Sequence, residues 1–176
     1  MQMKTIVLIA LLIGGAFLVF VMTDSGSMKP SGGMAAVGSQ APDFRLQDLK
    51  GKVWTLSELK GKVVLLHFWA TWCSTCEQEN PTLQNLMQAE RDNPQFVVLS
   101  ILVRDDADGA RAYMAKRGFD FPVLPDDKKT SMLYGLTGVP ETFLIDRNGI
   151  IRDKVIGPNT WDSPAVRAAL SKFIKN

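Results

Sequence analysis

The chain has 176 residues, 46% of them hydrophobic and 22% charged, which suits one folded domain with an attached segment and argues against a disordered or fibrous protein. Its net charge of +2 provides no single-sign field, so we expect no binding to nucleic acid. Two cysteines and one histidine cannot supply a four-ligand zinc site, and we expect no metal.

An uncharged apolar run of seventeen residues, IVLIALLIGGAFLVFVM, occupies positions 6–22 and follows Lys4. As a helix it would be about 25 Å long, which is enough to cross a thin or locally adapted bilayer core. We therefore interpret residues 1–22 as a single-pass membrane anchor, with a cleaved signal peptide as the alternative. Because the positive-inside bias keeps Lys4 in the cytoplasm, both interpretations place the rest of the chain on the periplasmic or extracytoplasmic side of the cell membrane.

Residues 23–38 are rich in glycine, serine and proline and are interpreted as a flexible tether, followed by one folded domain over residues 39–176. Periodicity and turn signals predict, in chain order, a short hairpin (44–46 and 53–54), a buried strand (62–70), a helix (74–92), a second buried strand (96–103), a helix (107–117), a hairpin (142–146 and 150–156) and a C-terminal helix from residue 163. Asp106 and Gly118 are suited to cap the two ends of the second helix. This order predicts an α/β fold in which helices cover both faces of a central mixed sheet.

Cys73 and Cys76 lie three positions apart, where the first buried strand is expected to meet its helix. A helix N-terminus carries unpaired N–H groups and partial positive charge, which stabilise the thiolate of Cys73, the reactive form in disulfide exchange. Cys76 lies one turn deeper and is expected to resolve the mixed disulfide that forms on Cys73. A purely structural disulfide is the alternative, although so short a loop would add little stability.

Three segments carry a family resemblance: GSQAPDFRLQDLKGKVWTLSELKGKVVLLHFWATWCSTC, ENPTLQNL and GVPETFLIDRNGIIRDKVIG. Over residues 39–157 the chain resembles the membrane-tethered TlpA/ResA-type branch of the thioredoxin-like family, and it is similar to the CcmG/DsbE proteins. The resemblance implies a thioredoxin-like fold with an extra N-terminal hairpin. It also implies an enzyme, a monomer, that reduces disulfides of exported proteins, apocytochrome c among them, with electrons from a membrane thiol reductase. No cofactor is expected beyond the redox-active pair of Cys73 and Cys76.

Several other positions match this pattern. Val139-Pro140 matches the family's cis-proline, which faces the cysteine pair and offers the backbone of Val139 as a strand edge for an incoming peptide. A trans-proline at a strand start is the alternative. Together with Trp72, these two residues are expected to bind the substrate. Pro81 matches a kink in the active-site helix that does not end the helix.

Two ionisable side chains are candidates for proton transfer. Glu79 follows Cys76 by one turn and matches an acidic residue that tunes the thiols in ResA-like proteins, with a solvated helix-face glutamate as the alternative. His67 stands on the buried strand where members of this branch commonly carry asparagine. It could take the proton of Cys76, since imidazole titrates near neutral pH. Alternatively, burial would keep His67 neutral and hydrogen-bonded to the backbone.

Three other functions stay open. A thiol peroxidase of the peroxiredoxin class shares the opening hairpin and strand, but Trp69 and Cys73 occupy the positions before Cys76 where peroxiredoxins carry Pro and Thr or Ser. A thioredoxin-like copper chaperone needs CxxxC and a distant histidine, whereas this chain has CxxC and its histidine on the preceding strand. A non-catalytic redox-sensing module would show no disulfide turnover. Nothing cationic lies between the cysteines, so we predict a reducing couple, nearer thioredoxin at about −270 mV than DsbA at about −120 mV.

Overall fold

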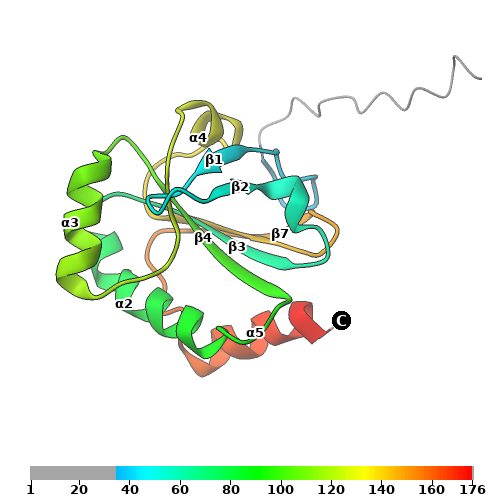
Figure 1. Ribbon diagram of the computed structural model, residues 1–176. Helices are drawn as coiled ribbons and strands as arrows, with labels where there is room; N and C mark the ends of the chain where they lie inside the picture. The colour runs from blue at the N-terminus through cyan, green and yellow to red at the C-terminus, as the bar shows by residue number, and fades with distance from the viewer. Residues whose placement is uncertain (1–34, 176) are drawn as a thin grey trace, which may run out of the picture. The chain divides into compact units, whose positions relative to one another are not determined.

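A five-stranded sheet runs through the centre of the domain in the order β5-β4-β3-β6-β7 (Figure 1). The computed structural model describes residues 35–175. The strands are β3 (Val63–Trp69), β4 (Phe96–Leu102), β5 (Val123–Pro125), β6 (Glu141–Ile145) and β7 (Ile151–Ile156). β4 pairs in parallel with β3 and β5, whereas β6 is antiparallel to both β3 and β7. The predicted mixed sheet is therefore confirmed.

The central strand β3 is buried along its whole length. A strand that is covered on both faces needs apolar side chains on both, which explains the nearly continuous run VVLLHFW. Because successive side chains point to opposite faces, Leu66 and Phe68 pack on one side of the sheet and His67 faces the other. His67 is the one polar side chain of this strand.

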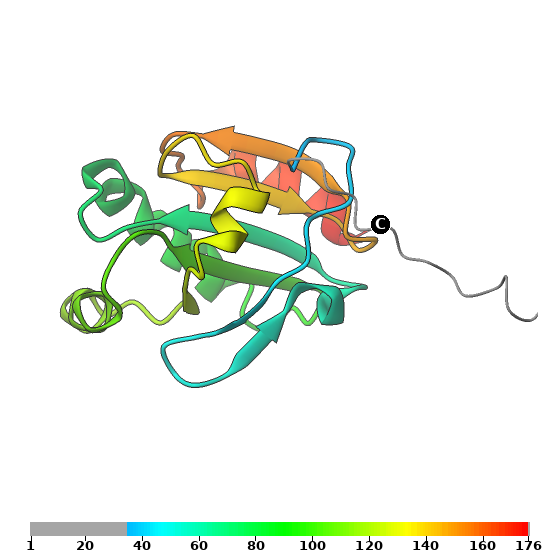
Figure 2. The ribbon, with the colours of Figure 1, turned by 90° about the horizontal axis from the view of Figure 1, so that it is seen from above.

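Each face of the sheet is covered by a different layer (Figures 1 and 2). One layer consists of the antiparallel hairpin β1 (Arg45–Gln47) and β2 (Val53–Thr55), the 3-10 helix η1 (Leu56–Leu59) and the short helix α4 (Lys129–Leu133). The other consists of α2 (Ser74–Ala89), α3 (Ala107–Arg117) and α5 (Pro164–Lys175). His67 points into this second layer, beneath α2.

The local signals at helix ends are largely confirmed. The side chain of Asp106 accepts a hydrogen bond from the N–H of Gly109 at the start of α3, and Gly118 ends this helix with a left-handed φ of 65°. α2 continues through Pro81, as expected. It ends at Ala89 and not at the predicted residue 92, because the chain turns at Glu90, whose carbonyl accepts from the N–H of Asn93.

The sequence pattern missed β5 and α4, and it placed the start of the domain late. β5 has three residues and α4 has five, too few to show a period. At the start of the described chain, Ala35 is buried and donates its N–H to the carbonyl of Leu133 in α4, at 3.2 Å. Gly38 likewise donates its N–H to the carbonyl of Ile151, so this stretch, expected in the tether, is bonded to the domain at Ala35 and Gly38 although residues 36–38 are exposed.

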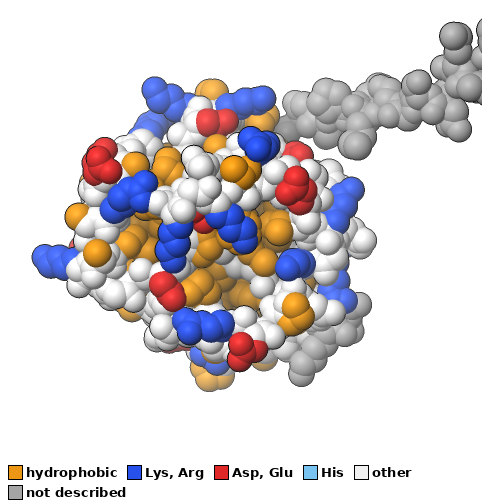
Figure 3. Space-filling view, in the orientation of Figure 1, with side chains coloured by type: hydrophobic (Ala, Val, Ile, Leu, Met, Phe, Trp, Pro, Cys, Tyr) orange, Lys and Arg blue, Asp and Glu red, His pale blue; other side chains and the backbone are white. Residues whose placement is uncertain are grey.

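Within residues 35–175, no helix has the length and apolar character needed to cross a membrane. The apolar run at 6–22, interpreted as an anchor or signal, and most of the tether lie outside the described residues. On the face of the domain shown in Figure 3, basic and acidic side chains are interspersed with hydrophobic ones. This mixture agrees with the net charge of +2.

Candidate active site

The cysteine pair lies at the connection between the end of β3 and the start of α2. Cys73 is the N-cap residue of α2 and forms a disulfide with Cys76, with a Cα–Cα distance of 5.3 Å. The sulfur of Cys73 also accepts a hydrogen bond from the N–H of Cys76, at 3.1 Å. Once the disulfide is reduced, this donor and the helix N-terminus favour the thiolate of Cys73. Cys73 is 6% exposed and Cys76 is 0% exposed, the order expected for an attacking and a resolving sulfur.

The turn before the cysteines is held by the loop that follows β4. The N–H of Thr71 donates to the carboxylate of Asp105. The indole N–H of Trp72 donates to the carbonyl of Arg104, at 3.2 Å. Although its N–H is bonded, Trp72 leaves 62% of its surface exposed. An anchored, exposed aromatic ring next to Cys73 is well placed to contact a partner protein.

The peptide bond between Val139 and Pro140 is cis, so the trans alternative is wrong. The carbonyl oxygen of Val139 lies 3.6 Å from the sulfur of Cys73, which places the cis-proline loop against the cysteine pair. Trp72 and Val139 line a hollow of about 170 Å³, together with Arg104 and Met132. Of the three residues expected to bind substrate, Trp72 and Val139 thus line one hollow, and Pro140, the residue after Val139, is buried.

Glu141, which the sequence reasoning missed, holds the cis-proline loop. Its buried carboxylate accepts hydrogen bonds from the N–H and hydroxyl of Thr137 and from the N–H of Gly138, and it pairs with Lys154 at 2.9 Å. Burial alone would raise the pKa of Glu141, but the bonds from Thr137 and Lys154 outweigh it and hold that pKa below its usual range. The only sequence signal was an acidic residue directly after Val139-Pro140.

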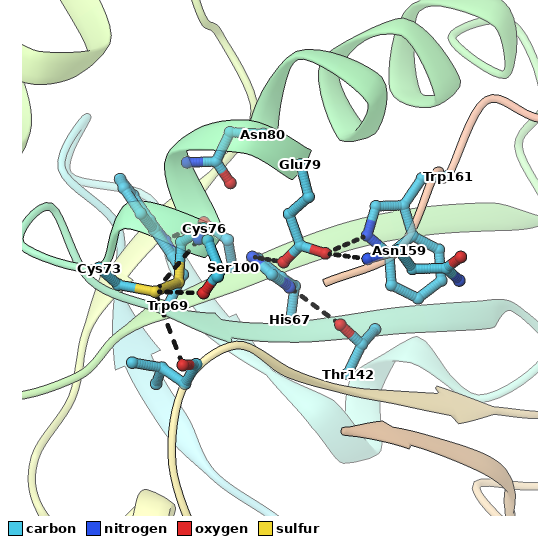
Figure 4. Close-up of polar contacts among 12 residues, drawn as sticks. His67, Trp69, Cys73, Cys76, Glu79, Asn80, Ser100, Thr142, Asn159 and Trp161 are labelled. Atoms are coloured by element: carbon cyan, nitrogen blue, oxygen red, sulfur yellow. Dashed lines mark hydrogen bonds and ion pairs between the residues drawn. A yellow bond between two sulfur atoms is a disulfide. The ribbon is translucent and has the colours of Figure 1, made fainter. Parts of the chain in front are cut away.

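Beneath α2, Glu79 and His67 form a buried pair (Figure 4). The His67 Nε2 atom lies 3.4 Å from the Oε1 atom of Glu79, and these residues are 0% and 2% exposed. The Oε2 atom of Glu79 accepts from the backbone N–H of Asn159, at 2.8 Å, and from the indole N–H of Trp161, at 3.2 Å. The solvated helix-face alternative for Glu79 is therefore wrong.

The ring of His67 uses its other nitrogen to contact a side chain and not the backbone. Its Nδ1 atom lies 2.9 Å from the hydroxyl of Thr142, the residue paired with it on β6, so the expected backbone hydrogen bond is not what the structure shows. Figure 4 draws the imidazole between Cys76 and the carboxyl group of Glu79. The imidazole that could take the proton of Cys76 thus makes its Nε2 contact with Glu79.

Burial shifts the pKa values of Glu79 and His67 in opposite directions. Removal from water raises the pKa of Glu79 to about 7, against a smaller opposing effect of the bonds from Asn159 and Trp161. The same cause lowers the pKa of His67 to about 3, so the imidazole is neutral at physiological pH. Near neutral pH, Glu79 is therefore the member of the pair whose charge changes, whereas His67 stays neutral.

The comparisons with known proteins agree with this geometry. The model of the AhpC/TSA family matches residues 37–154. The chain is 32% identical over 161 residues to the thiol-disulfide oxidoreductase ResA of Geobacillus thermodenitrificans, covering 90% of this chain and 88% of that protein. The chain belongs to the AhpC/TSA family and to its ResA-type thiol-disulfide oxidoreductases.

Two other relatives, both named as thiol:disulfide interchange proteins, give a consistent assignment. The thiol:disulfide interchange protein HelX of Rhodobacter capsulatus is 31% identical over 154 residues, covering 85% of this chain and 82% of HelX. A crystal structure of a protein assigned as the thiol:disulfide interchange protein DsbE, from Chlorobium tepidum, superposes with a TM-score of 0.70 at 35% identity. It covers 80% of this chain and 99% of that chain. The ResA-type chain is thus a thiol-disulfide oxidoreductase that exchanges disulfides through Cys73 and Cys76.

Proposed function

We propose that this ResA-type protein reduces disulfides of exported proteins on the extracytoplasmic side of the membrane, with apocytochrome c as a client. The uncharged run at 6–22 would tether the domain to the membrane, where a membrane thiol reductase would return electrons to the cysteine pair. The pair itself is the redox group, and no further cofactor takes part. The relatives named ResA and HelX support this assignment by their likeness over most of the chain.

Client reduction follows from the positions of the two sulfurs. The thiolate of Cys73 attacks one sulfur of the client disulfide, forming a mixed disulfide and expelling a client thiolate. Cys76 then loses its proton, for which the buried Glu79, one turn further along α2 and able to titrate near neutral pH, is the proposed final acceptor, and the Cys76 thiolate attacks the sulfur of Cys73. This step restores the Cys73–Cys76 disulfide and releases the second client thiolate. Two electrons pass to the client, which takes up two protons.

One observation carries the proposal: the Cys73 sulfur lies at the start of α2 and 3.6 Å from the carbonyl of Val139. A client segment that pairs with the backbone beside the cis-proline would bring its own sulfur to Cys73. The exposed ring of Trp72 adds an apolar contact on the other side of the hollow. These contacts support an extended peptide as the proposed substrate.

Trapping in cells tests the proposal. With Cys76→Ser, the mixed disulfide on Cys73 cannot be resolved, so exported clients should accumulate on the protein and be identified after purification. The matched control carries Cys73→Ala in addition and should trap nothing. Trapped partners confined to the cytoplasm would contradict the proposed location. A purified protein that consumes peroxide but does not reduce insulin would assign the thiol peroxidase alternative instead.

A further inference from the structure

Three polar side chains beside the cysteine pair are connected in a row, with His67 in the middle and nearest Cys76 (Figure 4). Glu79 on α2 contacts the Nε2 atom of His67 on β3, at 3.4 Å. On the far side of the ring, the Nδ1 atom lies 2.9 Å from the hydroxyl of Thr142 on β6. All three side chains are buried. Such a line can pass a proton from one end to the other, because an imidazole can accept at one nitrogen while it donates at the other.

The far end of this line lies at the wall of a cavity. A cavity of about 190 Å³ lies between β6, β7 and α5, and Thr142 forms part of its lining. The two residues that bond the Oε2 atom of Glu79, Asn159 and Trp161, also line this cavity. Most of the other lining side chains are apolar, and Arg152 and Asp153 from β7 add charged groups to which water in the cavity could bind.

We propose that His67 relays the proton of Glu79 to the hydroxyl of Thr142, and from there to water in the cavity beneath α5. The relay rests on the proposed function, in which Glu79 has received this proton from Cys76. It would let Glu79 be emptied after each turnover by a path that avoids the client, which covers the cysteine side during the reaction.

Every bond that breaks in the relay is matched by a bond that forms. The O–H bond of Glu79 breaks as an N–H bond forms at Nε2 of His67. The N–H bond at Nδ1 breaks as Thr142 gains a proton, and the original hydroxyl proton of Thr142 passes to a water molecule. The ring ends as the opposite neutral tautomer, so no imidazolium forms. This matters because burial strongly disfavours a charged His67. When the Cys73–Cys76 disulfide is reduced again, the reverse transfer brings a proton from water through Thr142 and His67 to Glu79, and the ring regains its Nδ1–H form.

Few other ionisable groups of the described chain are close enough to affect the protonation of Glu79 or His67. Cys76 on α2 lies on the side of the imidazole away from Glu79. From α3, the hydroxyl of Tyr113 accepts a hydrogen bond from the side chain of Asn80, the neighbour of Glu79. On the cavity side, Arg152 and Asp153 are the charged lining residues. One residue before Thr142, Glu141 is already neutralised by Lys154.

The tautomer of His67 can be read directly, because this chain has one histidine. When Glu79 is protonated it donates to Nε2, and the ring proton resides on Nδ1. When Glu79 is ionised, Nε2–H donates to it, and Nδ1 accepts from Thr142. We expect the ring ¹⁵N spectrum of the oxidised full-length protein in detergent micelles to pass from the Nδ1–H to the Nε2–H form between about pH 5 and pH 9, around the Glu79 pKa of about 7.

In Glu79→Gln the tautomer should be constant over the same range. A single tautomer throughout the wild-type titration, or an unchanged switch in Glu79→Gln, would overturn the relay. Since this readout needs no client, it is independent of the proposed function. Wild-type protein that switches tautomer but does not reduce insulin would reject the proposed function, whereas an active protein without the switch would reject the relay.

A pair of substitutions at Thr142 tests the exit of the proton. Thr142→Val keeps the side-chain shape but removes the hydroxyl, and it should slow insulin reduction at pH 7 by about tenfold. Thr142→Ser keeps the hydroxyl and should retain near wild-type turnover despite the lost methyl group. A purely structural role for Thr142 predicts the reverse order, because valine preserves packing better than serine does. Equal rates for the two variants, or a slower serine variant, would contradict the relay.

Discussion

Replacing Glu79 by glutamine should remove a pH-dependent cost of folding from this protein. The carboxyl group is 2% exposed and contacts a neutral imidazole, two N–H donors and no cation within the described chain. Ionising it in the folded state is therefore harder than ionising it in water. Glutamine keeps the shape and an acceptor for the bonds from Asn159 and Trp161, but it cannot ionise.

The size and sign follow from the two pKa values of Glu79. In the folded protein burial raises this pKa from 4.5 to about 7. Between these pH values the folded state holds a proton that the unfolded state has released, so the stability from this group is present below pH 4.5 and is lost as pH rises through 7. A pKa difference of about 2.5 corresponds to about 3 kcal/mol of unfolding free energy.

His67 works in the opposite direction. Its folded pKa of about 3 lies below the ordinary 6.5, so stability from this group is present above pH 6.5 and is lost as pH falls toward 3. The two effects partly cancel in wild-type protein at mildly acidic pH. Comparison of wild type with Glu79→Gln isolates the contribution of Glu79, because His67 is present in both.

The assay is urea unfolding of the oxidised full-length protein in a nonionic detergent, followed by tryptophan fluorescence from about pH 4 to pH 9. Relative to wild type, Glu79→Gln should gain about 3 kcal/mol of unfolding free energy on going from the acidic to the basic end of this range. The control, Glu58→Gln, changes an exposed glutamate on η1 and should follow the wild-type curve. Parallel curves for wild type and Glu79→Gln at every pH would refute a buried, proton-holding Glu79.

Three further results are expected. In the reduced protein, iodoacetamide should alkylate Cys73 at least about tenfold faster than Cys76, as mass spectrometry can show; similar rates would contradict the assigned roles. Glu141→Gln should lower the unfolding free energy by about 2 kcal/mol, because Lys154 loses a partner 2.9 Å away. Adding Lys154→Met should recover part of this loss, and an unchanged urea midpoint in the single variant would argue against the assigned contact. Trp72→Ala should raise the KM for a protein client by about tenfold while its reduction by dithiothreitol stays the same. A changed dithiothreitol rate would instead indicate a disturbed cysteine pair.

The sequence alone determined the features that depend on local spacing. A seven-residue apolar run can be satisfied by a strand buried on both faces, so β3 and the start of α2 could be located from the residue pattern. Two cysteines three apart at a helix start meet within the first turn whatever surrounds them, which fixed Cys73 as N-cap and Cys76 as the deeper sulfur. The cis-proline was found by likeness of sequence, because spacing does not reveal the isomer of a peptide bond.

Only the tertiary structure decided how the buried ionisable groups behave. The partners of Glu79 other than His67 are Asn159 and Trp161, which lie 80 and 82 positions further along the chain. The partner of His67, Thr142, is 75 positions away. A pKa depends on which distant segments displace water from a group and which donors they bring to it. Local residue spacing carries no information on that, so the same glutamate could be predicted equally well as solvated or buried until the fold placed α5 and its preceding loop over it.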